Sequence, residues 1–132
     1  MLRQVLAPVA GVVVGAAVVA LVEAAGRSFY PTPTVVPAEQ GQLVVGALPL
    51  GALAAVVVAW GLGAMAGSFV AALIARRHAR RAALIAGGVL LASTVANLVM
   101  IPHPIWMMLA GPLVVAAGTL AAVRLAGAGA ND

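Results

Sequence analysis

Arg76-Arg77-His78-Ala79-Arg80-Arg81 is the stretch that divides this chain, and it holds four of the seven basic residues. The sequence on either side is apolar: 64% of the residues are hydrophobic, 8% are charged, and the mean hydropathy is +1.17. A soluble domain has about 25% charged residues, so we expect the membrane to be the solvent of this chain. Because basic loops between spans stay on the cytoplasmic side, residues 76–81 are predicted to form a cytoplasmic loop.

Apolar runs lie on both sides of this cluster, each close to the roughly 20 residues that cross a bilayer core. The sequence therefore predicts an all-α fold, a four-transmembrane-helix bundle that forms a single integral membrane domain over residues 1–132. Its spans are expected at about 5–25, 49–75, 82–101 and 105–124, with an outer loop at 26–48. The first run could also be the core of a secretory signal, but its 18 residues exceed the usual length of about 7–15, so we favour a retained span.

The basic residues also predict an orientation. With the 76–81 loop inside, Arg3 and Arg124 are inside as well, and only Arg27 is outside. Both termini are then cytoplasmic, N-in and C-in. Arginine without lysine, together with abundant Ala, Gly and Val, favours a bacterial origin and hence the inner membrane. Since topology accounts for these charges, we expect anionic lipid headgroups as their partners, not nucleic acid. The headgroup-binding residues are Arg76, Arg77, Arg80 and Arg81.

Small residues recur at intervals of four along the predicted helices. Every fourth residue from Ala47 to Ala75 is Ala or Gly. Such a face lets another helix backbone approach closely, which is how helices associate in lipid. The predicted packing residues are Gly11, Gly15, Gly51, Ala55, Ala59, Gly63, Gly67 and Ala71, and a shorter face comprises Gly88, Ala92 and Ala96. The partner could be a helix of the same chain, a second copy in a homo-oligomer or a larger membrane complex.

A few polar and aromatic residues on the outer side could form a site. An acidic residue at membrane depth is a functional hypothesis by default, although Glu23 could instead pair with Arg27, one turn away. His103 lies between two prolines in a short turn, where it could transfer protons or serve only as a polar turn residue. The candidate polar site comprises Glu23, Arg27, Tyr30, Asn97, His103 and Trp106. We expect no cofactor and no metal, because a good metal site needs three or four ligands and only Glu39 is an evident third.

Several short motifs resemble one known family. The segment Glu23–Gly26 followed by Tyr30-Pro31, the small-residue stretch after Trp60, and Ile101-Pro-His-Pro-Ile-Trp106 resemble a family of uncharacterised small bacterial four-span integral membrane proteins. The resemblance implies a four-helix architecture and draws attention to Glu23, Asn97, His103 and Trp106. It implies no activity.

Two function classes remain after these exclusions. The favoured one is a structural, accessory or complex-forming subunit that acts through close helix packing, because the packing pattern is the stronger signal. The alternative is a small transporter or channel with a polar site at the outer face, built from Glu23 and His103. We do not expect an enzyme, because the sequence pairs no nucleophile with a base and contains no phosphate-binding loop.

Overall fold

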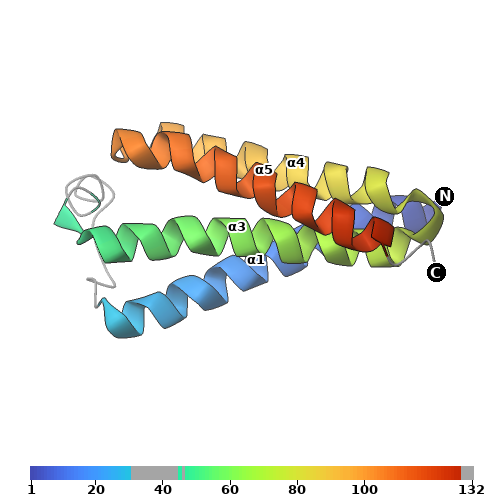
Figure 1. Cartoon of the computed structure of the whole chain (residues 1–132), viewed down its shortest axis with the longest axis horizontal. Coiled ribbons are helices and arrows are strands. Elements are labelled where there is room, and N and C mark those ends of the chain that lie inside the picture. The colour runs from blue at the N-terminus through green and yellow to red at the C-terminus, as the bar shows by residue number, and fades with distance from the viewer. Residues whose placement is uncertain (31–44, 46, 129–132) are drawn as a thin grey trace.

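The computed structural model describes residues 1–30, 45 and 47–128 of the chain. Figure 1 shows α1 (Leu2–Phe29), α3 (Leu50–Ala75), α4 (Ala79–Met100) and α5 (Ile105–Ala128). Between α3 and α4 lies a single 3-10 turn, η1 (Arg76–His78). These elements are all helical, which confirms the predicted all-α class.

The prediction of a four-helix bundle was wrong in its count of helical segments. Within the described residues, three segments are long and apolar enough to cross a membrane: Leu2–Phe29, Leu50–Met100 and Ile105–Gly127. The middle segment is 51 residues long and contains both of the spans predicted at 49–75 and 82–101. The predicted cytoplasmic loop at 76–81 is absent, because these residues form η1 and the first turn of α4. The chain is therefore a membrane protein whose middle helical segment doubles back at η1.

The reversal at η1 depends on one unusual backbone conformation. Arg76, which caps the C-terminus of α3, has φ 50° and ψ −95°. No other non-glycine residue in the described part of the chain has a positive φ. A residue with a Cβ is strained at positive φ by about 1–2 kcal/mol. Such strain persists where the surrounding structure requires it, and here α3 and α4 must pack against each other.

Arg76→Gly is expected to stabilise the protein by about 1 kcal/mol, because glycine adopts positive φ without a Cβ clash. Arg77→Gly is the matched control, since it removes the same charge from the neighbouring residue of η1, where φ is not positive. Thermal unfolding in detergent, followed by circular dichroism, measures the difference. Equal melting temperatures for the two variants would contradict a strained turn at Arg76.

At the end of the molecule opposite η1, prolines and extended residues mark where helices begin and end. Pro49 is the N-cap of α3 and has an extended backbone. Ile101 follows α4 in an extended conformation, as expected for a residue before proline. The backbone carbonyl of Pro104 accepts hydrogen bonds from the amides of Met107 and Met108 in the first turn of α5. The outer loop predicted at 26–48 begins later than expected, because α1 continues to Phe29. Its residues 31–44 and 46 lie outside the described residues.

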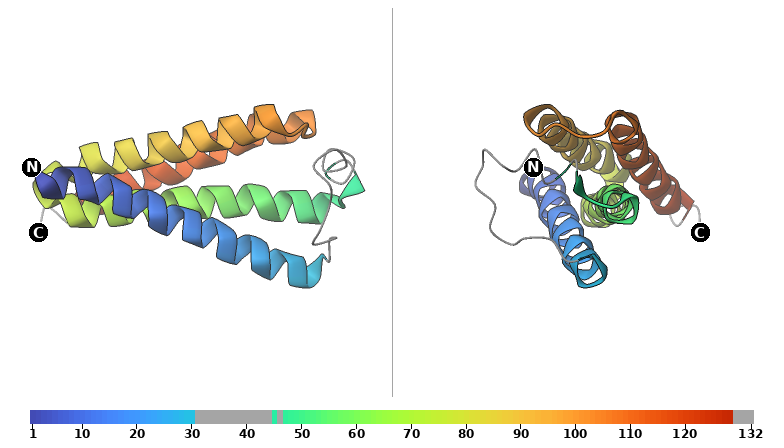
Figure 2. Two further views of the ribbon diagram at one scale, coloured as in Figure 1. Left: turned by 180° about the vertical axis from the view of Figure 1, so that it is seen from behind. Right: turned by 90° about the vertical axis from the view of Figure 1, so that its left-hand side faces the viewer.

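Helix α3 is the centre of the fold. The end-on view in Figure 2 places it between α1 on one side and α4 and α5 on the other. Two clusters of buried residues follow its length: a large one around Trp60 and Met107, and an alanine-rich one around Ala71 and Ala86. The N-terminus, η1 and the C-terminal end of α5 lie at one end of the molecule (Figure 1). We call this end the η1 end, and the opposite one the Glu23 end.

Candidate functional site

The glycines of α1 and α3 face each other along a direct backbone contact. A Cβ built on Gly15 would lie 2.8 Å from the carbonyl oxygen of Gly63, and one on Gly67 would overlap the carbonyl oxygen of Gly11. No side chain can rotate to make room at these points, since the obstacle is backbone. This part of the predicted packing face is therefore covered by α1 of the same chain.

The rest of the predicted packing face has other neighbours. Ala59 and Ala71 are fully buried. Ala55 lies against Gly26 near the end of α1, whereas Gly51 faces the side chain of Tyr30 and not another helix.

A second close interface, between α5 and its neighbours, was missed by sequence reasoning. A Cβ on Gly118 would overlap the carbonyl oxygen of Gly61, and one on Gly87 would overlap the side chain of Thr119. The hydroxyls of Ser68 and Thr119 are buried and 3.5 Å apart, so they can satisfy each other between α3 and α5. The pairing of Gly61 with Gly118 could have been suspected only by comparing the small residues of both helices.

A cleft between α1, α3 and α4 gathers most of the polar side chains of the membrane-embedded region. It has a volume of about 350 Å³, within the range of small-molecule sites. Its polar lining consists of Glu23 from α1, Trp60 from α3, and Ser93, Thr94 and Asn97 from α4. The other lining residues are apolar, and many are small. Glu23 and Asn97, predicted separately from the sequence, thus line one cavity, which we call the Glu23 cleft.

Trp60 connects the Glu23 cleft to His103. Its indole is 6% exposed and lines the cleft, while its ring meets the His103 imidazole edge-on, with centroids 6.2 Å apart at 65°. His103 Nδ1 lies 2.5 Å from the carbonyl oxygen of Ile101. A carbonyl can only accept, so Nδ1 donates the proton and Nε2 of a neutral ring stays an acceptor. His103 itself does not line the cleft, so the indole separates it from the space beside Glu23.

Glu23 also borders a smaller cavity of about 170 Å³ toward the end of α1. Arg27 and Tyr30 line this second cavity with it, so Glu23 and Arg27, one turn apart on α1, face a shared space. Trp106 lies elsewhere, partly buried against the cluster around Trp60. The predicted polar residues therefore divide among the Glu23 cleft, the Arg27 cavity, the turn that holds His103 and the start of α5, which holds Trp106.

The Glu23 cleft offers both hydrogen-bond acceptors and donors, because the Trp60 indole N–H only donates, whereas Thr94 and Asn97 can donate and accept. The Ser93 hydroxyl donates its proton to the carbonyl oxygen of Val89 at 2.9 Å. Its oxygen can therefore serve the cleft only as an acceptor. An ionised carboxylate is an acceptor only, and the indole face attracts cations. No group of three His, Cys, Asp or Glu side chains within the described residues could hold a metal ion. Glu39 lies outside those residues.

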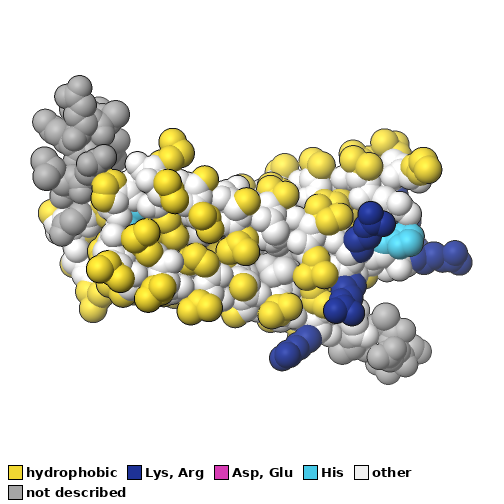
Figure 3. Space-filling view, turned by 90° about the horizontal axis from the view of Figure 1, so that it is seen from above, with side chains coloured by type: hydrophobic (Ala, Val, Ile, Leu, Met, Phe, Trp, Pro, Cys, Tyr) yellow, Lys and Arg dark blue, Asp and Glu magenta, His cyan; other side chains and the backbone are white. Residues whose placement is uncertain are grey.

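The predicted headgroup-binding arginines lie at the η1 end. Arg76, Arg77, Arg80 and Arg81 are all exposed, and Figure 3 shows the basic side chains gathered at this end of the surface. Arg3 lies at the same end, and its Nε donates a hydrogen bond to the carbonyl oxygen of Ile74 at 2.6 Å. This bond fastens the start of α1 to the end of α3.

No protein-family model matches the chain, and no curated protein or solved structure is similar to it.

Proposed function

We propose that the protein is a small membrane transporter that takes up a cationic solute in the Glu23 cleft. The observation that supports this proposal is the gathering of one carboxylate, one indole and three further polar side chains in a single cavity with apolar walls. Of the two polar residues in the original alternative, Glu23 is retained in the site. His103 contributes through Trp60 and not by direct contact with the cleft.

The energetics of the cleft favour a positively charged ligand. An acidic side chain at membrane depth is costly and pairs with a cation, a proton or another polar group. A cation over the Trp60 indole gains up to about 2 kcal/mol when it is desolvated. The oxygens of Ser93 and Asn97 add acceptors for an ammonium group. The apolar remainder of the lining suits a ligand with a hydrocarbon body.

The binding test uses two probes that match in size and shape but differ in charge. Tetraphenylphosphonium is expected to quench Trp60 fluorescence in the purified protein, and tetraphenylborate is expected to bind much more weakly. Glu23→Gln is expected to weaken tetraphenylphosphonium binding by about tenfold, because the negative charge that the described lining of the cleft offers to the cation is lost. Uptake of the cation by proteoliposomes then tests transport.

Arg27→Gln is the control for this experiment. Arg27 is exposed, lies one turn beyond Glu23 and does not line the Glu23 cleft. Its removal is expected to leave cation binding unchanged or to strengthen it, because a nearby positive charge disappears. If both probes bind equally and Glu23→Gln changes neither, the cleft has no preference for cations and the proposal is wrong.

A complex-forming subunit is the second candidate, and a different observation favours it. A shallow groove on the outer face of α4 contains Gly88, Ala92 and Ala96, all exposed. A Cβ on Gly88 would meet no atom of the described residues within 4 Å. Another helix could therefore pack closely against α4 at this point. Cross-linking through Ala92→Cys is informative because the chain contains no native cysteine.

We further infer a bacterial inner-membrane location with both termini in the cytoplasm. Arg3, Arg124 and the arginine cluster at 76–81 provide six of the seven basic residues, and Arg27 provides the other. This bias is the signal on which the positive-inside rule depends. Membership of the bacterial family that the chain resembles remains a proposal based on its short motifs.

A further inference from the structure

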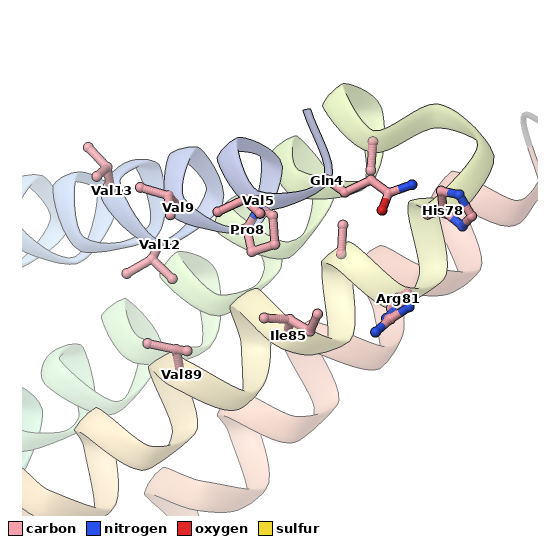
Figure 4. A pocket seen from close by; sticks show the side chains of 12 residues that line it. Gln4, Val5, Pro8, Val9, Val12, Val13, His78, Arg81, Ile85 and Val89 are labelled. Atoms are coloured by element: carbon pink, nitrogen blue, oxygen red, sulfur yellow. The ribbon is translucent and has the colours of Figure 1, made fainter. Parts of the chain in front are cut away.

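A groove between α1 and α4 at the η1 end combines an apolar channel with a basic end. Its volume is about 580 Å³. Figure 4 shows valines of α1 facing Ile85 and Val89 of α4, with Gln4, His78 and Arg81 together at one end. Val9 is 54% exposed and Ile85 is 45% exposed, so both walls face the lipid. The buried Pro8 and Ala82 lie between them.

The basic end opens into a second hollow. This hollow has a volume of about 510 Å³ and is lined by Arg77, His78, Arg80, Arg81, Leu84 and Ile85. His78, Arg81 and Ile85 line both spaces. An apolar channel thus borders a cluster of cationic side chains, and that arrangement suits an amphipathic ligand with an anionic head.

The length of the groove matches one leaflet of a bilayer. The ten residues from Gln4 to Val13 span about 14 Å along α1, close to half of the roughly 30 Å hydrocarbon core. An acyl chain that enters from the η1 surface would therefore fill the channel within its own leaflet. A soluble anion would leave this apolar length empty.

The groove on the outer face of α4 provides an internal comparison. It is similarly large, about 650 Å³, and its lining from Gly88 to Met100 contains no charged residue. A groove in lipid does not in itself require basic residues at its end. The arginines beside the α1–α4 groove therefore distinguish it from ordinary lipid-facing surface.

We propose that the α1–α4 groove binds one anionic phospholipid, with an acyl chain between Val9 and Ile85 and its phosphate at Arg81, His78 and Arg77. Arginine binds phosphate oxygens through paired N–H groups, and basic pockets between helices on the cytoplasmic side recognise anionic headgroups. This site is separate from the Glu23 cleft and goes beyond the general attraction of basic residues to a negative membrane surface.

The test measures how lipids change the melting temperature of the full chain purified in dodecyl maltoside. Dioleoyl phosphatidylglycerol is expected to raise the melting temperature in a concentration-dependent way, and dioleoyl phosphatidylcholine is not. Arg81→Gln is expected to weaken the phosphatidylglycerol effect about fivefold. Val9→Trp is expected to weaken it to a similar extent, because the larger side chain fills the channel.

Two matched variants distinguish a defined site from general effects. Arg124→Gln removes an exposed charge at the same end of the molecule but outside both hollows. Leu120→Trp enlarges a side chain on α5 that is 53% exposed, against 54% for Val9. Both variants are expected to respond to phosphatidylglycerol as the wild type does. Melting temperatures without lipid show whether each variant is folded.

The proposal is overturned by any of three outcomes. Equal stabilisation by sn-glycerol 1-phosphate would show that the phosphate acts without an acyl chain. An equal loss of response in Arg124→Gln would show non-specific charge attraction. An unchanged response in folded Val9→Trp would show that the channel is not occupied.

Discussion

Gly67→Leu is expected to destabilise the protein by at least about 3 kcal/mol, at the upper end of the usual cost of overpacking. The Cβ atom alone would overlap the carbonyl oxygen of Gly11 and come within 3.1 Å of Gly15 Cα. Because these are backbone atoms, α1 would have to move away from α3 as a whole. The van der Waals contacts that hold helices together in lipid would then be lost along the interface.

Gly88→Leu is the matched control for this prediction. Gly88 is also a helical glycine in an apolar segment, but an added Cβ would meet nothing within 4 Å. Its substitution is expected to leave the monomer at wild-type stability. Denaturation by sodium dodecyl sulfate, followed by tryptophan fluorescence, compares the two variants. Equal stability losses would show that the contact between α1 and α3 is not the reason for the glycine.

Gly88→Leu also tests whether the α4 groove is an interface with a second protein chain. If it folds normally but abolishes assembly in light scattering or cross-linking, the α4 groove is an interface and the subunit candidate is favoured. If assembly is unchanged, that groove does not pack against a partner.

Trp60→Ala is expected to cost about 3–5 kcal/mol, the usual range when a large aromatic side chain is removed from a core. The indole is buried in the main cluster with Leu53 and Met107, and the backbone of α5 approaches it at Gly111. Its removal would leave a cavity at the junction of the helices. It would also remove the ring that lies between the Glu23 cleft and His103.

Trp106→Ala is the control, because it removes the same atoms from a partly buried site on the edge of that cluster. A clearly smaller loss of stability is expected. Trp60→Phe keeps much of the volume, so it is expected to fold while binding tetraphenylphosphonium more weakly, since Trp provides the strongest cation–π face. Equilibrium dialysis measures this binding, because the Trp60 fluorescence is lost in the variant. A Trp60→Ala variant as stable as Trp106→Ala would contradict the central position of the indole.

The membrane helices could be predicted from the sequence, because local composition and the spacing of apolar residues are enough to identify them. The hydropathy of the runs around the arginine cluster predicted membrane helices, and the structure contains apolar helices over these runs. The sequence predicted a loop at residues 76–81, whereas the chain reverses there through the 3-10 turn η1 and the first turn of α4. Arginines cannot lie in lipid, and this excludes a span through residues 76–81, but it does not distinguish an open loop from a 3-10 turn with a strained Arg76.

The candidate site was predicted less well. Glu23 and Asn97 were chosen independently as polar residues at membrane depth, and the structure brings them to one cleft. Trp60 was not among the predicted site residues, because nothing in its neighbourhood in the sequence indicates that α1, α4 and the His103 turn all meet there. Conversely, the alternative of a transporter site built from Glu23 and His103 required the two residues to lie together, and the indole lies between them.

The sequence by itself determined the solvent, the helical class and the placement of charge at one end, because each depends on local composition. In lipid, a run of apolar residues must satisfy its own backbone hydrogen bonds, and a helix does so without help from the rest of the chain. Tertiary structure alone decided that α1 covers Gly63 and Gly67, that α5 approaches Gly61, and that the α4 face at Gly88 remains open. These outcomes depend on which helix faces of small residues pack against each other. In lipid that choice is made by van der Waals contact, which depends on how well the shapes of whole helices fit together.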